Sequence, residues 1–483
     1  MDCLKPLVAI ALCLSLIGAG CATNPVTGER QFSLVSESQE IAMGQAAAAE
    51  VRQTIGLVDD RGLQDYVSTT GLALARASER PKLPWSFQVV DDPTPNAFAL
   101  PGGFIFVTRG MLNLMDSQAE LASVLGHEIG HVTARHSATA ISRQQLAQLG
   151  LGLGGIFLPE VQPFGQAIGA GLGLLFLKHG RDAERQADQL AVQYAGGGNY
   201  DVRETIDVFE SLGRAGDDQR SALPTWLSTH PAPAERIDAL REYIGTSGAK
   251  TGSVVDRAEY LGQIEGLIYG SNPRQGFFRD QVFYHPDLQF RFSLPPGWAT
   301  QNLTHAVEAI SPNRDAAIIL MLATASSPAA AARQLAAQQN VRMLQSSVER
   351  INGLSSVVSV FDAAAEAGVV RGIAAHIELG GRVYELIGYA PLERFSSNGT
   401  LIERALNSFG PLTDRATLAI QPRRIDIVTL RRAMTVAEFA REYGSPIPVE
   451  ELALLNQVDG PNAVLAAGSL AKRVTGPPSS SMR

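Results

Sequence analysis

The HEIGH motif at residues 127–131 constrains this chain more than any other part of its sequence. Ser117 and Glu120 stand before it, and their spacing is a capping-box signature that predicts the start of a helix. Within such a helix, His127 and His131 lie on one face, one turn apart. Two neutral imidazoles in this arrangement can bind one zinc ion, so the motif predicts a metal centre.

A catalytic zinc site needs more than two histidines. Glu128 follows the first histidine and is placed to take a proton from the attacking water and pass it to the leaving amine. A third protein ligand is also required, with one position left open for water. Glu184 and Asp188 lie one helical turn apart further along the chain. Alone, such a pair indicates a solvated helix face. Beside the two histidines, it favours Glu184 as the third zinc ligand and Asp188 as a hydrogen-bond acceptor that fixes the tautomer of a ligating histidine.

The N-terminus has the pattern of an export signal. Residues 1–20 contain a lysine and then an apolar stretch that ends in small residues just before Cys21. The stretch is short for a membrane span, although an uncleaved transmembrane helix remains the alternative. Small residues before a cysteine resemble the lipobox of bacterial lipoproteins, which prefers leucine where Gly18 stands here. We therefore expect residues 1–20 to be a signal peptide.

Cysteine usage supports a lipid anchor. The only cysteines are Cys3, Cys13 and Cys21, so cleavage before Cys21 leaves one thiol and no possible internal disulfide. Acylation of this thiol would hold the protein on a membrane surface without spanning the membrane. The sequence thus predicts lipidation at Cys21.

Length and charge limit the remaining possibilities. A chain of 483 residues is too long for one ordinary core. Its hydrophobic fraction of 45% and charged fraction of 18% are those of a globular protein with little disorder away from the ends. The formal net charge of −8 gives no basic face that would neutralise phosphates, so nucleic acid is excluded as a partner.

The pattern along the chain predicts several domains. Residues 21–245 are mainly helical, with two short stretches of strand-like alternation that indicate a small sheet. Residues 283–412 alternate strand-like pieces with an alanine-rich helix, and are expected to form a smaller α+β domain whose role the sequence does not indicate. Between them, residues 246–282 are expected to be a linker. The tail, residues 475–483, is expected to be disordered.

Two glycine-rich apolar runs lie between residues 146 and 177. Each run is short for a membrane span, and together they predict a helical hairpin or a flap beside the active site. Core packing and a contact with membrane or substrate are equally compatible with them. His136 and His179 are expected to be structural or to contact the zinc ligands. The histidines of the later domain are isolated and are expected to be ordinary surface or core residues: His285, His305 and His376.

Five motifs, in order along residues 21–245, resemble the HExxH metallopeptidases that include the prenyl-protein (CAAX) endopeptidases and the periplasmic β-barrel assembly-enhancing protease. The motifs are Cys21–Gly28, Asn96–Gly103, the HExxH helix, Glu184 with Asp188, and His230-Pro231 with Arg236. The resemblance implies a zincin fold in which Glu184 is the third zinc ligand. It also implies that His230 lies near the zinc, where it regulates the metal or stabilises the oxyanion.

The same resemblance implies an edge strand at the active site. Asn96, Ala97 and Phe98 precede a proline–glycine turn. In the family, this segment looks like the strand on which a peptide substrate could lie by main-chain pairing.

Residues 424–474 resemble a LysM module, a βααβ fold that binds N-acetylglucosamine polymers. The similarity depends on residues 427–429, 434–440 and 451–456. Where that family often has Gly-Asp-Thr, this chain has Ala-Met-Thr at residues 433–435, which argues against sugar binding. No 34-residue helical repeat is visible, unlike in the assembly-enhancing protease, so the partner-binding mode of that protein is not carried over.

Together these features predict an α+β chain with a zincin-like metallopeptidase domain, a smaller α+β domain and a LysM-like module. One zinc ion is expected at His127, His131 and Glu184, with Glu128 and His230 as catalytic residues. The expected function is that of a zinc-dependent endopeptidase of the bacterial cell envelope that degrades misfolded or stalled proteins. It would face the periplasm, be held at the outer membrane by lipid on Cys21, and contact peptidoglycan through the LysM-like module.

Two alternatives remain open from the sequence. One is a zinc-containing, chaperone-like or peptidoglycan-tethered scaffold without turnover, in which His230 closes the fourth metal position. The other is an intramembrane protease, which would require residues 146–177 to insert into the bilayer.

Overall fold

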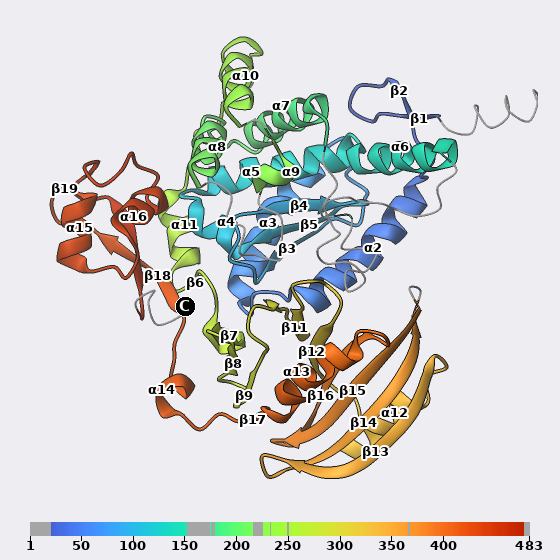
Figure 1. Ribbon diagram of the computed structural model, residues 1–483. Coiled ribbons are helices and arrows are strands. Elements are labelled where there is room, and N and C mark those ends of the chain that lie inside the picture. The colour runs from blue at the N-terminus through green and yellow to red at the C-terminus, as the bar shows by residue number, and fades with distance from the viewer. Residues whose placement is uncertain are drawn as a thin grey trace, which may run out of the picture. The chain divides into compact units, whose positions relative to one another are not determined.

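The computed structural model describes residues 21–151, 174, 179–215, 226–231, 233–248, 251–365 and 368–477. The chain divides into two compact units (Figure 1). Unit 1 contains the residues up to Gly270 together with Arg424–Thr475, and unit 2 contains Ser271–Arg423 and the residues from Gly476 onward. Unit 2 is therefore inserted into the sequence of unit 1. The predicted signal peptide, residues 1–20, lies outside the described residues.

Unit 1 is built on a three-stranded sheet and a set of helices. The sheet has the order β3-β5-β4, in which β3 is parallel and β4 antiparallel to β5. Its strands are β3 (Ser86–Val90), β4 (Ala97–Leu100) and β5 (Phe104–Thr108). The helices are α2 (Glu37–Thr54), α3 (Arg61–Arg76), α4 (Arg109–Leu114), α5 (Gln118–Thr133), α6 (His136–Leu151), α7 (Arg181–Gly197), α8 (Glu204–Ala215), α9 (Trp226–Thr229), α10 (Pro233–Thr246) and α11 (Arg257–Ile264). A hairpin of β1 (Cys21–Thr23) and β2 (Arg30–Phe32) precedes them.

Helix α5 is the central element of unit 1, and it lies between α7 and the sheet (Figure 1). It begins where the sequence predicts, because the hydroxyl of Ser117 accepts a hydrogen bond from the Glu120 N–H at 3.1 Å. The second half of the capping box differs, since the Glu120 carboxylate accepts the N–H of Asp116 at 2.6 Å. Every residue of α5 from Ala119 to Thr133 is buried.

Two glycines let α7 approach the backbone of α5. A Cβ at Gly126 would lie 3.2 Å from Ala191 Cα, and one at Gly130 would lie 3.1 Å from Ala187 Cα. Because these glycines are four residues apart, they lie on the same face of α5, and at both positions no side chain separates α5 from α7. The side chains that α7 carries are thereby brought close to those of α5.

The C-terminal residues of unit 1 have the order βααβ. Their elements are β18 (Arg423–Thr429), α15 (Val436–Tyr443), α16 (Val449–Leu455) and β21 (Leu470–Thr475), with a small pair of strands, β19 (Met434–Thr435) and β20 (Val464–Leu465). Strand β18 is antiparallel to β21 and also neighbours β6 (Ile268–Tyr269) in the same sheet.

Unit 2 contains a seven-stranded antiparallel sheet of order β10-β11-β12-β16-β15-β14-β13. Its strands are β10 (Ala299–Asn302), β11 (Ala306–Ile310), β12 (Ala317–Leu322), β13 (Val341–Ile351), β14 (Leu354–Ala365), β15 (Gly368–Leu379) and β16 (Arg382–Pro391). Successive residues of β15 point to opposite faces. Ile373 packs with α13 (Phe395–Asn407), whereas Ala374 packs with α12 (Pro328–Ala336), so the two helices cover opposite faces.

A second sheet in unit 2 has the order β17-β9-β8-β7. Its strands are β7 (Phe277–Arg279), β8 (Val282–His285), β9 (Phe290–Ser293) and β17 (Gly410–Pro411). The histidines of unit 2 are dispersed. His285 is half-buried, His305 is exposed, and His376 is buried with its Nε2 2.7 Å from Glu385. None of the three belongs to the metal-binding group that is found among the described residues.

The apolar runs predicted between residues 146 and 177 fall almost wholly outside the described residues. Helix α6 ends at Leu151, and within 152–178 the structure describes Leu174 alone. Among the helices that are described, none combines the length and the apolar character needed to cross a membrane.

Candidate metal centre

Four side chains from three parts of unit 1 meet in its interior. His127 and His131 come from α5, Glu184 from the first turn of α7, and His230 follows α9; their ligand atoms all lie within 4.8 Å of one another. The Nε2 atoms of the two α5 histidines are 3.0 Å apart, and each is 3.6 Å from an oxygen of Glu184. Imidazole nitrogens and a carboxylate are the ligands that zinc takes in catalytic sites. The donor set therefore fits zinc.

His230 is held at the same point by its own surroundings. Its Nδ1 lies 3.1 Å from both oxygens of Glu184 and 3.3 Å from Nε2 of His127. Its ring stacks on Trp226, whose carbonyl accepts the His230 N–H at 2.8 Å. Burial opposes a charge on this imidazole, but the carboxylates of Glu184 and Glu128 outweigh burial and raise its pKa.

Glu128 lies beside this group with an oxygen that is free to react. Its carboxylate is buried, and no donor in the described part of the structure hydrogen-bonds its Oε1. That oxygen lies 3.7 Å from Nε2 of His230. Burial raises the pKa of Glu128. A raised pKa makes the carboxylate a better proton acceptor, which suits a general base.

Arg236 of α10 holds the two acids of α7 in place. Its guanidinium reaches both oxygens of Asp188, at 2.8 and 2.6 Å, and Glu184 at 3.0 Å. It also lies over the rings of Phe209 and Trp226, 4.8 and 4.7 Å from their centroids. Although burial opposes ionisation of Asp188, the arginine lowers its pKa. The sequence placed Arg236 in a family motif, but this contact with both acids was not predicted.

The Nδ1 atoms of the two α5 histidines have polar neighbours on different elements. Nδ1 of His127 lies 3.0 Å from Asp188, which is the contact the sequence predicts for that acid. Nδ1 of His131 lies 2.9 Å from Nδ1 of His136, whose Nε2 is 3.0 Å from the amide oxygen of Gln186. These contacts leave Nε2 of both α5 histidines directed at the common point.

His179 also contacts this group, because its ring stacks on His131 with centroids 4.1 Å apart. Burial lowers its pKa to about 3, so the ring is neutral at physiological pH. The structure thus places both His136 and His179 against His131.

Comparison with known proteins gives the family. A model of peptidase family M48 matches residues 62–244. The mitochondrial metalloendopeptidase OMA1 of Schizosaccharomyces pombe is 32% identical over 240 residues, which are 47% of this chain and 67% of that protein. This chain belongs to peptidase family M48.

Other relatives are similar over a smaller share of their length. The β-barrel assembly-enhancing protease of Yersinia pestis is 32% identical over 230 residues, 45% of this chain and 46% of that protein. The mitochondrial metalloendopeptidase OMA1 of Arabidopsis thaliana is 35% identical over 187 residues, 38% of this chain and 37% of that protein. The chain therefore spans less than half the length of these two relatives. Among solved structures, cyanobacterial PsbP from Synechocystis sp. PCC 6803 aligns with 27% of this chain and 91% of its own, at 12% identity and a TM-score of 0.24.

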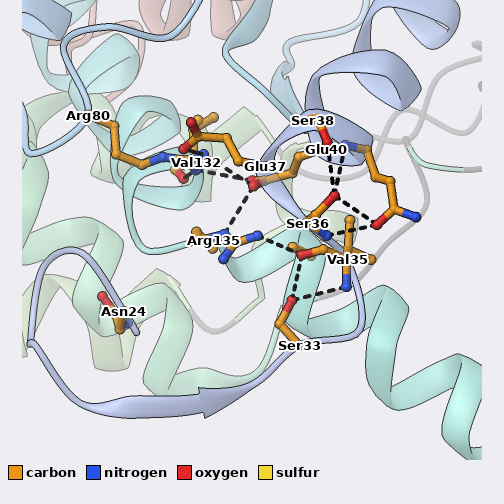
Figure 2. Close-up of polar contacts among 12 residues, drawn as sticks. Asn24, Ser33, Val35, Ser36, Glu37, Ser38, Glu40, Arg80, Val132 and Arg135 are labelled. Carbon is orange, nitrogen blue, oxygen red and sulfur yellow. Dashed lines mark hydrogen bonds and ion pairs between the residues drawn. The ribbon is translucent and has the colours of Figure 1, made fainter. Parts of the chain in front are cut away.

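The C-terminal end of α5 is held by a buried ion-pair cluster (Figure 2). Glu40 of α2 binds Arg80 through both oxygens at 3.1 Å and Arg135 at 3.0 Å. Arg80 also donates to the carbonyl of Val132 at 2.9 Å, and Arg135 donates to the carbonyl of Val35 at 2.8 Å. The Val132 carbonyl has no partner inside the helix and accepts the Arg135 N–H at 3.1 Å, so Arg80 adds a second donor to it, in the turn that carries a predicted zinc ligand.

Arg135 adopts a left-handed conformation, with φ of 60°, directly after the cap of α5. We expect Arg135→Ala to lower the free energy of unfolding by about 1 kcal/mol more than Arg135→Gly, because both lose the guanidinium but only alanine is strained at positive φ. Urea unfolding of the two metal-free variants measures the difference. Equal free energies would show that this backbone conformation is not retained.

Strand β4 of the M48 domain lies at the edge of the sheet, and no described strand pairs with its outer side. Ala97 and Phe98 are buried, and the carbonyl of Asn96 accepts the N–H of Thr108 at 2.9 Å. The preceding carbonyl, of Pro95, accepts the N–H of Trp226 at 3.1 Å. This bond ties the start of the strand to the segment that carries His230.

Proposed function

We propose that this M48 chain is a zinc-dependent endopeptidase whose metal is bound by His127, His131 and Glu184. The observation that supports it most directly is the convergence of these side chains within 4.8 Å, next to the free oxygen of Glu128. Metalloendopeptidases among its relatives, named as such, support the same reaction.

The residues around this site have separate roles in the proposed peptide hydrolysis. Zinc in this position would polarise the substrate carbonyl and make water acidic enough to act as a nucleophile near neutral pH. Glu128 takes a proton from the water while the water oxygen forms a bond to the carbonyl carbon of the substrate. Glu128 then delivers that proton to the nitrogen as the C–N bond breaks, which leaves a carboxylic acid and an amine; the acid then loses its proton to the solvent. Asp188 and Arg236 act by holding His127 and Glu184 in position.

His230 is the second catalytic candidate. Its Nε2 faces Glu128 at 3.7 Å, so the ring borders the place where the substrate carbonyl must lie. A donor there stabilises the charge that develops on the carbonyl oxygen. We therefore assign to His230 the role of stabilising the oxyanion that forms on the substrate carbonyl.

The edge of β4 is the proposed position of the substrate. An extended peptide that adds to a free sheet edge gains main-chain hydrogen bonds without regard to its side chains. Asn96, Ala97 and Phe98 would form this edge, which would allow the enzyme to bind unfolded proteins of varied sequence.

The proposed location is the periplasmic face of the bacterial envelope. It is supported by the signal-like residues 1–20 and by the lipobox-like residues before Cys21. Lipid on Cys21 would hold the enzyme at the outer membrane, with misfolded or stalled envelope proteins as substrates. The βααβ order of the C-terminal residues is compatible with a peptidoglycan contact.

The proposal is tested by metal content and metal removal on the mature chain with Cys21→Ser. We expect about one zinc ion per chain, loss of casein cleavage after treatment with 1,10-phenanthroline, and recovery on addition of zinc. A variant with His285→Gln, a histidine of unit 2, serves as control and should behave as the parent does. Cleavage that persists in the metal-free protein would overturn the proposal.

A further inference from the structure

Residues 424–475 share a sheet and a core with the M48 domain. At the junction of β18 and β6, the Gly266 N–H donates to the Ile425 carbonyl and the Ile425 N–H donates to the Leu267 carbonyl, both at 2.9 Å. Apolar side chains of the C-terminal residues belong to the same buried cluster as Tyr260 of α11. The C-terminal segment is therefore a fixed part of unit 1.

One lysine of this segment contacts the residues just before α5, the helix that carries His127 and His131. Lys472 of β21 is fully buried, and its Nζ lies 2.7 Å from Asp116. The same ammonium donates to the carbonyls of Asn113 and Met115 at 2.9 Å and of Leu114 at 3.3 Å. These carbonyls end α4, and the residue that follows Asp116 is the N-cap of α5. Lys472 thus adds a donor to the carbonyls at the end of α4, where the Leu114 carbonyl also accepts from Gln457 at 3.0 Å. Its ion-pair partner Asp116 directly precedes the N-cap of α5.

Two neighbouring side chains of the segment reinforce this contact. Gln457 donates to the Glu120 carboxylate at 2.9 Å, and this carboxylate in turn accepts the Asp116 N–H. Asn456 holds the backbone of Lys472, accepting its N–H at 2.8 Å and donating to its carbonyl at 2.7 Å. The backbone of Lys472 is therefore held by its own segment, while its side chain contacts the end of α4.

The contact has a consequence at the metal centre. A buried ammonium is costly unless it is paired and hydrogen-bonded, so Lys472 binds the junction of α4 and α5 in one geometry. Helix α5 is continuous from Gln118 to Thr133. Because the helix is continuous, the position of its first turn is one of the constraints on where His127 and His131 lie relative to Glu184.

We propose that residues 424–475 brace the metal-binding helix, and that Lys472 is the positioning residue through which they do so. The family match ends at residue 244, so this brace is supplied by a part of the chain outside the matched region. The inference rests on the proposed zinc site for its functional consequence.

The test uses the full mature chain with Lys472→Met, which keeps much of the side-chain volume and removes the charge. Arg473→Met is the matched control, because Arg473 is the next residue on the same strand and pairs with Asp426 instead. Zinc affinity is measured by competition with a chelator, and backbone hydrogen exchange is followed over residues 113–126. We expect Lys472→Met to bind zinc about ten-fold more weakly or worse, with faster exchange in this segment, and the control to match the parent.

The inference is overturned if folded Lys472→Met has the zinc affinity and the exchange rates of the parent. If Lys472→Met does not fold, Gln457→Leu decides, because it removes the hydrogen bonds to Glu120 and to the Leu114 carbonyl at the same junction while the ion pair of Lys472 with Asp116 stays in place. A smaller shift in the same direction supports the brace, and unchanged values contradict it. If the parent itself binds no zinc, the proposed function fails, while hydrogen exchange still tests the brace.

Discussion

Glu128→Gln should lower kcat for casein cleavage by about 10²- to 10⁴-fold while the zinc content stays at the parent level. Glutamine keeps the shape of the side chain but cannot accept a proton from water. Because Glu128 is not among the four grouped ligand residues, its replacement leaves the donor set intact. Zinc analysis and initial rates, measured side by side on parent and variant, check both parts of this expectation.

A surface acid provides the control for this variant. Glu235→Gln removes a carboxylate that pairs with Arg185 near the surface, and should change neither rate nor zinc content. Substantial cleavage by Glu128→Gln would mean that another group acts as the base. Bound zinc without cleavage in the parent and in the variant would favour the scaffold without turnover.

Arg236→Met should lower the free energy of unfolding of the metal-free protein by about 3–5 kcal/mol. The substitution leaves Asp188 and Glu184 buried without their shared cation. An uncompensated buried carboxylate is far more costly than the loss of a surface ion pair. Urea unfolding in the presence of a chelator isolates this effect from zinc binding.

The same helix offers a matched comparison. Arg241 of α10 pairs with Glu210 and Asp238 at the surface, so Arg241→Met should change the free energy of unfolding by less than about 1 kcal/mol. If the two variants lost similar amounts of unfolding free energy, Arg236 would not be what stabilises the buried carboxylates of Asp188 and Glu184. Zinc titration of refolded Arg236→Met should also show weaker binding, since Glu184 loses its orienting partner.

Much of the candidate metal centre could be predicted because its residues lie close together in the sequence, within single helices. The start of α5 follows from Ser117, and the shared face of His127 and His131 follows from helical spacing alone. Glu184 and Asp188 follow by the same rule on α7. The contribution of His230 came from resemblance to a family, because a lone histidine in a loop has no periodic signature.

Contacts between distant segments could not be predicted from the sequence. Nothing near Glu40 indicates that it will bind Arg80 and Arg135, since these residues come together only when α2 packs beside the end of α5. Resemblance to a family singled out Arg236, but nothing in the sequence indicates that its guanidinium contacts both Asp188 and Glu184. Even the capping box was only half predictable, because Glu120 has a better placed donor in Asp116 than in the cap residue.

The insertion of Ser271–Arg423 into the sequence of unit 1 bears on when the proposed zinc site can form during synthesis. Lys472 contacts Asn113 across 359 positions of sequence, and residues Ser271–Arg423 of unit 2 are synthesised between them. Contacts of such separation form late, after the intervening chain has been ordered. The N-terminal part emerges first during synthesis, so the zinc motif exists long before its helix is anchored at both ends. If residues 424–475 brace α5 as proposed above, a chain cut short by stalled synthesis would carry the motif but bind zinc weakly.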